Sequence, residues 1–261
     1  MEHYDFIVIG SGPAGRRAAI QAAKLSKKVL VVERGRRVGG VSVHTGTIPS
    51  KTLRETALNL SGWRERGFYG RSYRVKQDLT ANDLRARLHI TLNHEIEVLE
   101  HQFARNQVTT LCGEARFLNP TSIEVIGEEG EHFQFSADRF LLAVGTVPFR
   151  PDHIPFDGKT VFDSDEILNL ETLPRSITVI GAGVIGVEYA TIFNALDVHV
   201  TLVEPRNSML DFIDRELIDD IKHQMKDRGM VLRFGRKVEE IIKLEGGGCE
   251  IKMEGGRHIR V

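Results

Sequence analysis

Two glycine-rich segments have the residue types and the spacing of a dinucleotide-binding turn. They are Gly10-Ser11-Gly12-Pro13-Ala14-Gly15 and Gly181-Ala182-Gly183-Val184-Ile185-Gly186. In such a turn the first glycine permits a tight bend, the second lets a pyrophosphate approach the backbone, and the third lets the following helix pack closely on the preceding strand. Amides at the helix N-terminus then bind the negative charge.

An acidic residue completes each motif, because a carboxylate at the end of the next strand binds ribose hydroxyls. Glu33 follows Gly15 by 18 positions, and Glu204 follows Gly186 by 18 positions. One glycine motif alone is also typical of an ordinary turn, but two complete copies predict two dinucleotides. We expect a tightly held FAD and an exchangeable NAD or NADP, because a flavin accepts a hydride from one partner and passes it to another.

The elements around these motifs predict an α/β fold with an internal duplication. In each copy an apolar strand leads into the glycine turn, a helix and a second strand: residues 6–9, 13–24 and 29–32, then 177–180, 184–196 and 198–203. We predict two Rossmann-like dinucleotide-binding domains, an FAD-binding domain at 1–150 and an incomplete NAD(P)-binding domain at 151–261.

The remaining segments are expected to complete these domains. A small β-meander is predicted at 108–140 in the first domain, and a buried strand at 140–145. Apolar residues at helical spacing predict a long scaffold helix at 82–104 and another helix at 215–228, whereas 61–80 is expected to be irregular.

Composition limits the partners of the chain. It has 261 residues and a formal net charge of −1, which favours neither nucleic acid nor an anionic membrane surface. No apolar run approaches the roughly 20 residues of a membrane span. Cys112 and Cys249 lie far apart, and the histidines show no metal-ligand spacing. We therefore expect no metal, no disulfide framework and a cytoplasmic location.

The loop after the first duplicated unit resembles that of a known family. Its residues are Gly39-Gly40-Val41-Ser42-Val43-His44-Thr45-Gly46-Thr47-Ile48-Pro49-Ser50-Lys51. The loop resembles the redox loop of the two-dinucleotide flavoprotein disulfide reductases, in which two cysteines form the redox disulfide. Ser42 and Thr47 stand at those positions, which excludes dithiol chemistry here. The pattern at 44–51, with segments 162–168 and 181–190, is similar to the soluble pyridine nucleotide transhydrogenases, a branch of the family without the disulfide.

The resemblance implies a role for each matching position. FAD would contact Gly10, Gly12, Pro13, Ala14, Gly15, Glu33, Arg34, Gly35, Arg36, Arg37, Val38, Gly39, Gly40, Val41, Ser42, Gly46, Thr47, Lys51, Ala115, Ala143, Val144 and Gly145. The nicotinamide nucleotide would contact Gly181, Gly183, Val184, Ile185, Gly186, Glu204 and Arg206. Glu204 favours NAD because it would repel a 2′-phosphate, and Arg206 could offset that repulsion and admit NADP.

Three residues would serve the reaction itself. The resemblance places Lys51 near flavin N5, paired with Glu188, where a cation stabilises the reduced flavin. It places Thr47 beside the flavin ring. Outside such a loop, Lys51 would be an ordinary surface lysine and Glu188 an exposed helix residue.

Other polar residues near the loop have plainer expected roles. His44 is expected to be structural. Arg34, Arg36 and Arg37 form a short basic cluster that is either next to a phosphate or simply solvated. Val144 stands where the family usually has a threonine.

The implied activity is hydride transfer between NADPH and NAD through bound FAD. Two alternatives stay open: an NAD(P)H–quinone or diaphorase-type reductase, and a non-catalytic nucleotide-binding module. In the family a second FAD segment and a dimerisation domain follow the part that this chain resembles. The resemblance therefore implies a truncated, N-terminal portion of an enzyme that is homo-oligomeric when whole.

Overall fold

The computed structural model describes residues 1–70 and 72–261, which form two compact units. The first unit comprises Met1–Pro49 and His89–Val147, and the second comprises Ser50–Leu88 and Pro148–Val261. Each unit contains one glycine motif together with the strand that carries its acidic residue. The division into cofactor domains at 1–150 and 151–261 stays a prediction, because the compact units describe packing and not ligand binding.

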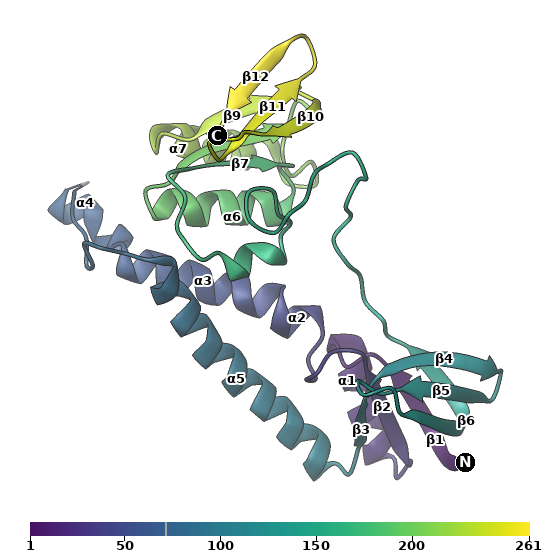
Figure 1. The fold of residues 1–261 in the computed structure, drawn as a ribbon. Coiled ribbons are helices and arrows are strands. Elements are labelled where there is room, and N and C mark those ends of the chain that lie inside the picture. The colour runs from purple at the N-terminus through teal and green to yellow at the C-terminus, as the bar shows by residue number, and fades with distance from the viewer. Residues whose placement is uncertain (71) are drawn as a thin grey trace. The chain divides into compact units, whose positions relative to one another are not determined.

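A six-stranded sheet forms the first unit, with the order β3-β2-β1-β6-β5-β4 (Figure 1). Its strands are β1 Glu2–Ile9, β2 Val29–Glu33, β3 Thr109–Cys112, β4 Glu114–Asn119, β5 Ser122–Ile126 and β6 His132–Leu142. Strands β3, β2, β1 and β6 are parallel, whereas β5 pairs antiparallel with both β4 and β6. The uninterrupted apolar run at the start of β2 is typical of a parallel strand that is buried on both faces.

Side chains of this sheet alternate between two apolar clusters. Val29 and Val31 of β2 face helices α1 (Pro13–Lys24) and α5 (Ala81–Arg105), where Phe103 is fully buried. Leu30 and Val32 face the opposite side and pack with residues of the β4–β6 meander. Because the side-chain period of a strand is two residues, β2 can supply both clusters at once.

Two predictions for this unit differ from the structure. The meander comprises β4, β5 and β6 only, and β3 pairs in parallel with β2, because the long helical connection that ends with α5 returns the chain to the same end of the sheet. The strand expected at 140–145 ends at Leu142, and the Val144 side chain is 71% exposed. Its partner β1 ends at Ile9, so the hydrogen-bonded ladder ends there too.

A three-stranded parallel sheet, in the order β7-β8-β9, is the centre of the second unit. Figure 1 shows α6 lying along one face of this sheet. The elements are η2 Glu166–Asn169, β7 Ser176–Ile180, α6 Val184–Ala195, β8 His199–Glu204, α7 Arg215–Asp227 and β9 Val231–Phe234. A separate antiparallel sheet follows, formed by β10 Val238–Lys243, β11 Cys249–Met253 and β12 Arg257–Arg260.

A helical segment completes the second unit. It includes most of α3 (Thr47–Leu60), η1 (Trp63–Glu65), α4 (Arg66–Tyr69) and the start of α5. The prediction of an irregular segment at 61–80 is therefore wrong for η1 and α4, and its residue 71 lies outside the described residues.

Asp197 attaches this helical segment to the parallel sheet. Its carboxylate lies 3.0 Å from Arg66 Nη1 and 2.6 Å from Arg74 Nη2. Trp63 packs against the guanidinium groups of both Arg66 and Arg228, at 5.0 and 4.9 Å from its ring centroid. Asp197 itself has φ of +64°, a conformation that aspartate and asparagine tolerate better than most residues.

The charge of Asp197 is therefore testable apart from its backbone conformation. We expect Asp197→Asn to destabilise the chain by about 1–2 kcal/mol, because two guanidinium groups lose a charged acceptor while asparagine keeps the left-handed backbone. Urea denaturation measures the change, with Asp219→Asn on the exposed face of α7 as the charge-matched control. An unchanged unfolding midpoint for Asp197→Asn would show that this ion pair contributes nothing to the attachment.

Candidate functional site

The turn between β1 and α1 needs its first and third glycines for steric reasons. We call this turn, with Glu33, the first cradle. Gly10 has φ of +103°, and a β-carbon added to it would lie 2.2 Å from the carbonyl oxygen of Ala143. A β-carbon on Gly15 would lie 1.9 Å from the carbonyl oxygen of Gly10. A larger residue at either position would therefore displace backbone atoms.

The turn between β7 and α6 repeats this geometry and, with Glu204, forms the second cradle. Gly181 also has φ of +103°, and a β-carbon on Gly186 would lie 1.9 Å from the carbonyl oxygen of Gly181. Around Gly183, no described heavy atom outside the local chain lies within 4 Å of the position of an added β-carbon. The second glycine of this cradle thus borders open space, which is where the motif requires a pyrophosphate to lie.

In both cradles the N-terminus of a helix lies directly after the second glycine of the turn. The N-cap residues Gly12 and Gly183 have ψ of −177° in each case, and α1 and α6 begin directly after them. The first turn of α1 contains Pro13, whose missing amide costs nothing at this position. Amides and the positive end of the helix dipole therefore face the region next to each glycine turn.

Glu33 is directed at its own cradle. One carboxylate oxygen accepts a hydrogen bond from the Ser11 amide at 2.9 Å and another, short, from the Ser11 hydroxyl. The other oxygen accepts from the Gly35 amide at 2.9 Å. Each oxygen has two lone pairs, so the carboxylate keeps capacity for a ribose hydroxyl.

Glu204 is held in the same way and is almost completely buried. Its Oε2 accepts a hydrogen bond from the Ala182 amide at 2.7 Å, and its Oε1 accepts from the Arg206 amide at 3.0 Å. Arg206 Nε donates to Oε1 at 2.8 Å. The hydrogen bond from the Arg206 guanidinium, together with the two amides, lowers the pKa of Glu204 from 4.5 to about 2, against the opposing effect of burial.

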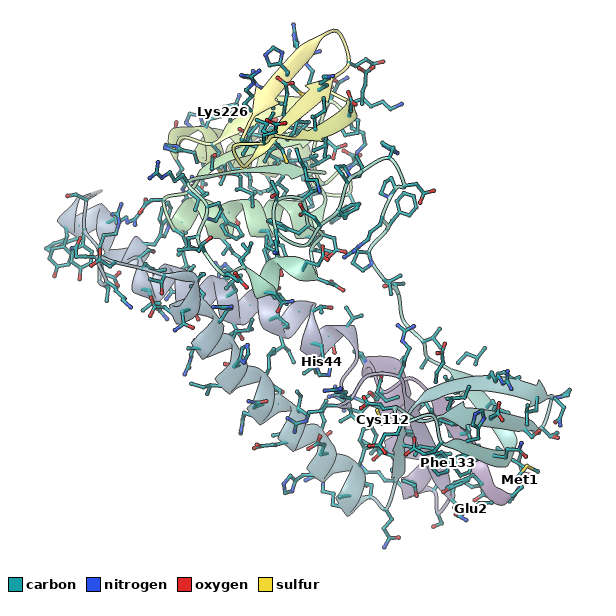
Figure 2. The ribbon with its side chains drawn as sticks, viewed as in Figure 1. Met1, Glu2, His44, Cys112, Phe133 and Lys226 are labelled. Carbon is teal, nitrogen blue, oxygen red and sulfur yellow. The ribbon has the colours of Figure 1, made fainter. Side chains whose placement is uncertain are left out.

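The loop that begins at Gly39, which we call the glycine loop, lies against the first cradle. The Gly39 amide donates to the Ser11 hydroxyl at 2.8 Å, and a β-carbon on Gly40 would lie 2.7 Å from Gly12 Cα. His44, labelled in Figure 2, ends the short helix α2 (Val41–His44). Its Nε2 lies 3.2 and 3.1 Å from two carbonyl oxygens of the loop, those of Arg37 and Val38. His44 Nε2 therefore donates, and the side chain fixes the loop as the structural role predicted for it requires.

The positions of the family's cysteines carry hydroxyl side chains in this chain. The Ser42 hydroxyl donates to the carbonyl oxygen of Gly39 at 3.3 Å. Thr47 begins α3 and is exposed. Gly46 lies close to Val41, where an added β-carbon would stand 2.9 Å from the Val41 carbonyl oxygen.

The basic cluster is mostly paired within the first unit. Arg36 Nε lies 3.2 Å from a carboxylate oxygen of Glu128, and Arg37 Nη2 lies 3.0 Å from one of Glu100. Arg34 is exposed. Whether the cluster lies next to a phosphate or is simply solvated stays a prediction.

The last predicted FAD positions lie at the edges of this unit. Ala143 adjoins Gly10, as its amide donates to the carbonyl oxygen of Ile9 at 2.8 Å. Val144 and Gly145 follow it and are exposed. Ala115 lies in β4, paired with Val125, and is partly buried. Their proposed contacts with FAD stay predictions.

Lys51 and Glu188 lie together in the second unit, as predicted from the family resemblance. Lys51 Nζ forms a short ion pair with Glu188 Oε1, although the two residues are 137 positions apart. The Glu188 side chain is 17% exposed and that of Lys51 is 61% exposed. The carboxylate is thus fixed on α6, while the ammonium group stays accessible to a ligand.

Two contributors to the cradles were not predicted. The Ser11 hydroxyl links Glu33 to the loop, and the Ala182 amide is the donor that orients Glu204. Both residues occupy the unspecified position between the first two glycines. The motif gives no signal for either, because it leaves the residue type at this position open, and the amide that orients Glu204 is present whatever the side chain.

Other types of site are not indicated. Within residues 1–70 and 72–261, histidine, cysteine and acidic side chains form no group of three suited to a metal ion. The helices in that same part of the chain include none with the length and apolar character needed to cross a bilayer.

The charge of Glu204 should make stability depend on pH. Because its pKa is lowered on folding, its stabilising effect is complete above its ordinary pKa of 4.5 and is lost as the pH falls towards about 2. We expect Glu204→Gln to destabilise the chain by about 2 kcal/mol near neutral pH, by roughly half of that near pH 3 and by little near pH 2. Urea denaturation at a series of pH values measures this, and parallel stability curves for the two proteins would contradict it.

Comparison with known proteins agrees with this geometry. The family model described as "Pyridine nucleotide-disulphide oxidoreductase" matches residues 4–261. The soluble pyridine nucleotide transhydrogenase of Mycobacterium tuberculosis is 48% identical over 242 residues, which are 92% of this chain and 52% of the relative. The corresponding protein of Colwellia psychrerythraea is 36% identical over 257 residues, 98% of this chain and 55% of the relative. The chain thus spans about half the length of these relatives.

Solved structures show the same fold. LpdA from Mycobacterium tuberculosis has a TM-score of 0.88 at 22% identity, with 100% of this chain and 57% of that chain covered. The HOCl-induced flavoprotein disulfide reductase RclA from Escherichia coli has a TM-score of 0.83 at 25% identity, with 98% and 54% covered. The predicted fold class and the predicted resemblance to the soluble transhydrogenases are confirmed. The chain belongs to the pyridine nucleotide-disulphide oxidoreductase family.

Proposed function

We propose that the first cradle binds FAD, that the second binds a nicotinamide nucleotide, and that the whole protein transfers hydride from NADPH to NAD. The observation that carries this proposal is the repetition of one geometry: two glycine turns with matching backbone angles, each hydrogen-bonded to a carboxylate at the end of the next strand. The similarity to proteins named soluble pyridine nucleotide transhydrogenase supports the choice of reaction.

The residues of both cradles fit a bound dinucleotide. Gly12 and Gly183 have φ of −61° and −76°, which any residue can adopt, so the fold alone does not require glycine at these two positions. Close approach of a ligand to the backbone does require it. The two cradles also differ as the proposal needs: Gly40 covers Gly12, as suits a retained cofactor, whereas Gly183 borders open space, as suits an exchangeable substrate.

Bound FAD would supply the hydride chemistry, and the protein would supply binding, orientation and charge. Lys51 keeps an accessible cation beside Glu188, and we assign to it the family's role of stabilising negative charge on the reduced cofactor. Ser42 and Thr47 cannot form a disulfide, so the proposal includes no dithiol substrate. The cytoplasmic location and the homo-oligomeric state of the whole protein stay predictions.

Two matched variants separate the proposed sites. We expect Gly12→Val to abolish retention of FAD, and Gly183→Val to weaken NAD(P) binding by at least about tenfold, roughly 1.4 kcal/mol, while FAD retention is unchanged. Valine fits the backbone angles at both positions. Its β-carbon would border open space at position 183, and at position 12 it would make ordinary contact with Gly40 Cα at 4.0 Å. Flavin absorbance of the purified chain measures the first effect, and calorimetric titration with NAD and NADP measures the second. If Gly183→Val lost its flavin and Gly12→Val kept the wild-type flavin content, the assignment of FAD to the first cradle and of the nicotinamide nucleotide to the second would be reversed.

The reaction itself is tested by anaerobic titration of the flavin-loaded whole protein, with the chain alone titrated in parallel. We expect both NADPH and NADH to bleach the flavin band, and thio-NAD to restore it faster than a quinone does. Rapid restoration by quinones but not by thio-NAD would favour the diaphorase alternative. A folded chain that binds nucleotides but never bleaches would favour the non-catalytic module.

A further inference from the structure

The guanidinium group of Arg206 is shared by two carboxylates at the carboxyl end of β8. Its Nε lies 2.8 Å from Glu204 Oε1, and its Nη1 lies 2.7 Å from Asp211 Oδ2. The Arg206 side chain is 54% exposed, so this arrangement lies at the surface beside the second cradle. Asp211 lies outside the dinucleotide motif.

The loop that carries Asp211 is held in one defined conformation. Leu210, directly before it, has φ of +49°, which is unfavourable for a leucine. Met209 and Leu210 are both buried, and the Ile213 amide donates to the Leu210 carbonyl oxygen at 2.9 Å. Burial of these apolar side chains offsets the backbone strain, and the result is that Asp211 faces Arg206.

The charges around Arg206 decide which ribose can bind. Glu204 is buried and stays negative at neutral pH, and Asp211 adds a second negative charge. The nearby Arg236 amide donates to the Glu204 carbonyl oxygen, and the Arg236 guanidinium lies 3.5 Å from the Gly235 carbonyl oxygen. Arg206 also donates from Nη2 to Glu204 Oε2 at 3.3 Å, so the guanidinium group contacts both oxygens of that carboxylate. A free 2′-hydroxyl carries no charge and needs no cation. A 2′-phosphate needs a cation, and the Arg206 guanidinium is already paired with Glu204 and Asp211.

We propose that Asp211 is a positioning residue that sets the preference of the second cradle between NAD and NADP. With NAD, Arg206 stays bound to both carboxylates. With NADP, Arg206 Nη1 leaves Asp211 Oδ2 and donates to the 2′-phosphate, while Nε keeps its hydrogen bond to Glu204. Asp211 therefore disfavours NADP by competing for the guanidinium group. This inference rests on the proposed function, because it requires the second cradle to bind a nicotinamide nucleotide.

Equilibrium binding of NAD and NADP to the chain tests this role. We expect Asp211→Asn to tighten NADP binding by about twofold to fivefold, the range for one exposed ion pair, with NAD binding unchanged. Asp227→Asn at the end of α7 makes the same change in net charge away from the cradle and should alter neither constant. Asp211→Glu keeps the carboxylate and should restore the wild-type preference, which a purely structural role would not predict.

A double variant shows whether Asp211 acts through Arg206. In the Arg206→Ala background, Asp211→Asn should bring no gain in NADP affinity, because the guanidinium group that it releases is absent. A gain of the same size in that background would overturn the proposed transfer of Arg206 from Asp211 to the 2′-phosphate. It would indicate that Asp211 repels the phosphate directly. If both nucleotides bind and Asp211→Asn leaves their ratio unchanged, only this inference fails. If neither nucleotide binds to the wild-type chain, the proposed function fails with it.

Discussion

A hydrogen bond between a backbone amide and a carboxylate connects each glycine turn of this chain to the strand beside it. Ser11 and Ala182 supply the amides, and Glu33 and Glu204 supply the carboxylates. The bond is possible only because parallel pairing brings the end of the second strand next to the turn that follows the first. It fixes the direction of the carboxylate, and so determines where a ribose hydroxyl would find its acceptor.

The third glycine of each turn makes this arrangement possible. At both Gly15 and Gly186 an added β-carbon would lie 1.9 Å from the carbonyl oxygen of the first glycine. The helix can therefore start close enough to the strand for its amide-bearing end to face the ligand space. A methyl group there would move the helix, the turn and the carboxylate contact together, since the three share the same few backbone atoms.

The two copies have diverged around this common geometry. In the first, Ser11 adds a hydroxyl that links Glu33 to Gly39, so the glycine loop and the turn form one connected structure. In the second, the equivalent Ala182 adds no such link, and Arg206 joins the carboxylate instead. The first copy is thereby connected to its own loop, whereas the second has open space at Gly183 and a cation beside its carboxylate.

The sequence by itself determined the duplicated strand–turn–helix units, the two carboxylates and the family, because these depend on local spacing and on residue types such as glycine that few others can replace. It also suggested Lys51 and Glu188 as a pair, but only through resemblance. Tertiary structure alone decided which groups meet: Ser11 with Gly39, Asp197 with the helical segment, and, within one loop, Asp211 with Arg206. Those contacts depend on how the loops fold, and surface carboxylates and hydroxyls carry no sequence pattern that identifies their partners. The end of β6 at Leu142 was also decided by the tertiary structure, since it is set by the length of its neighbour β1 and not by the apolar residues of β6 itself.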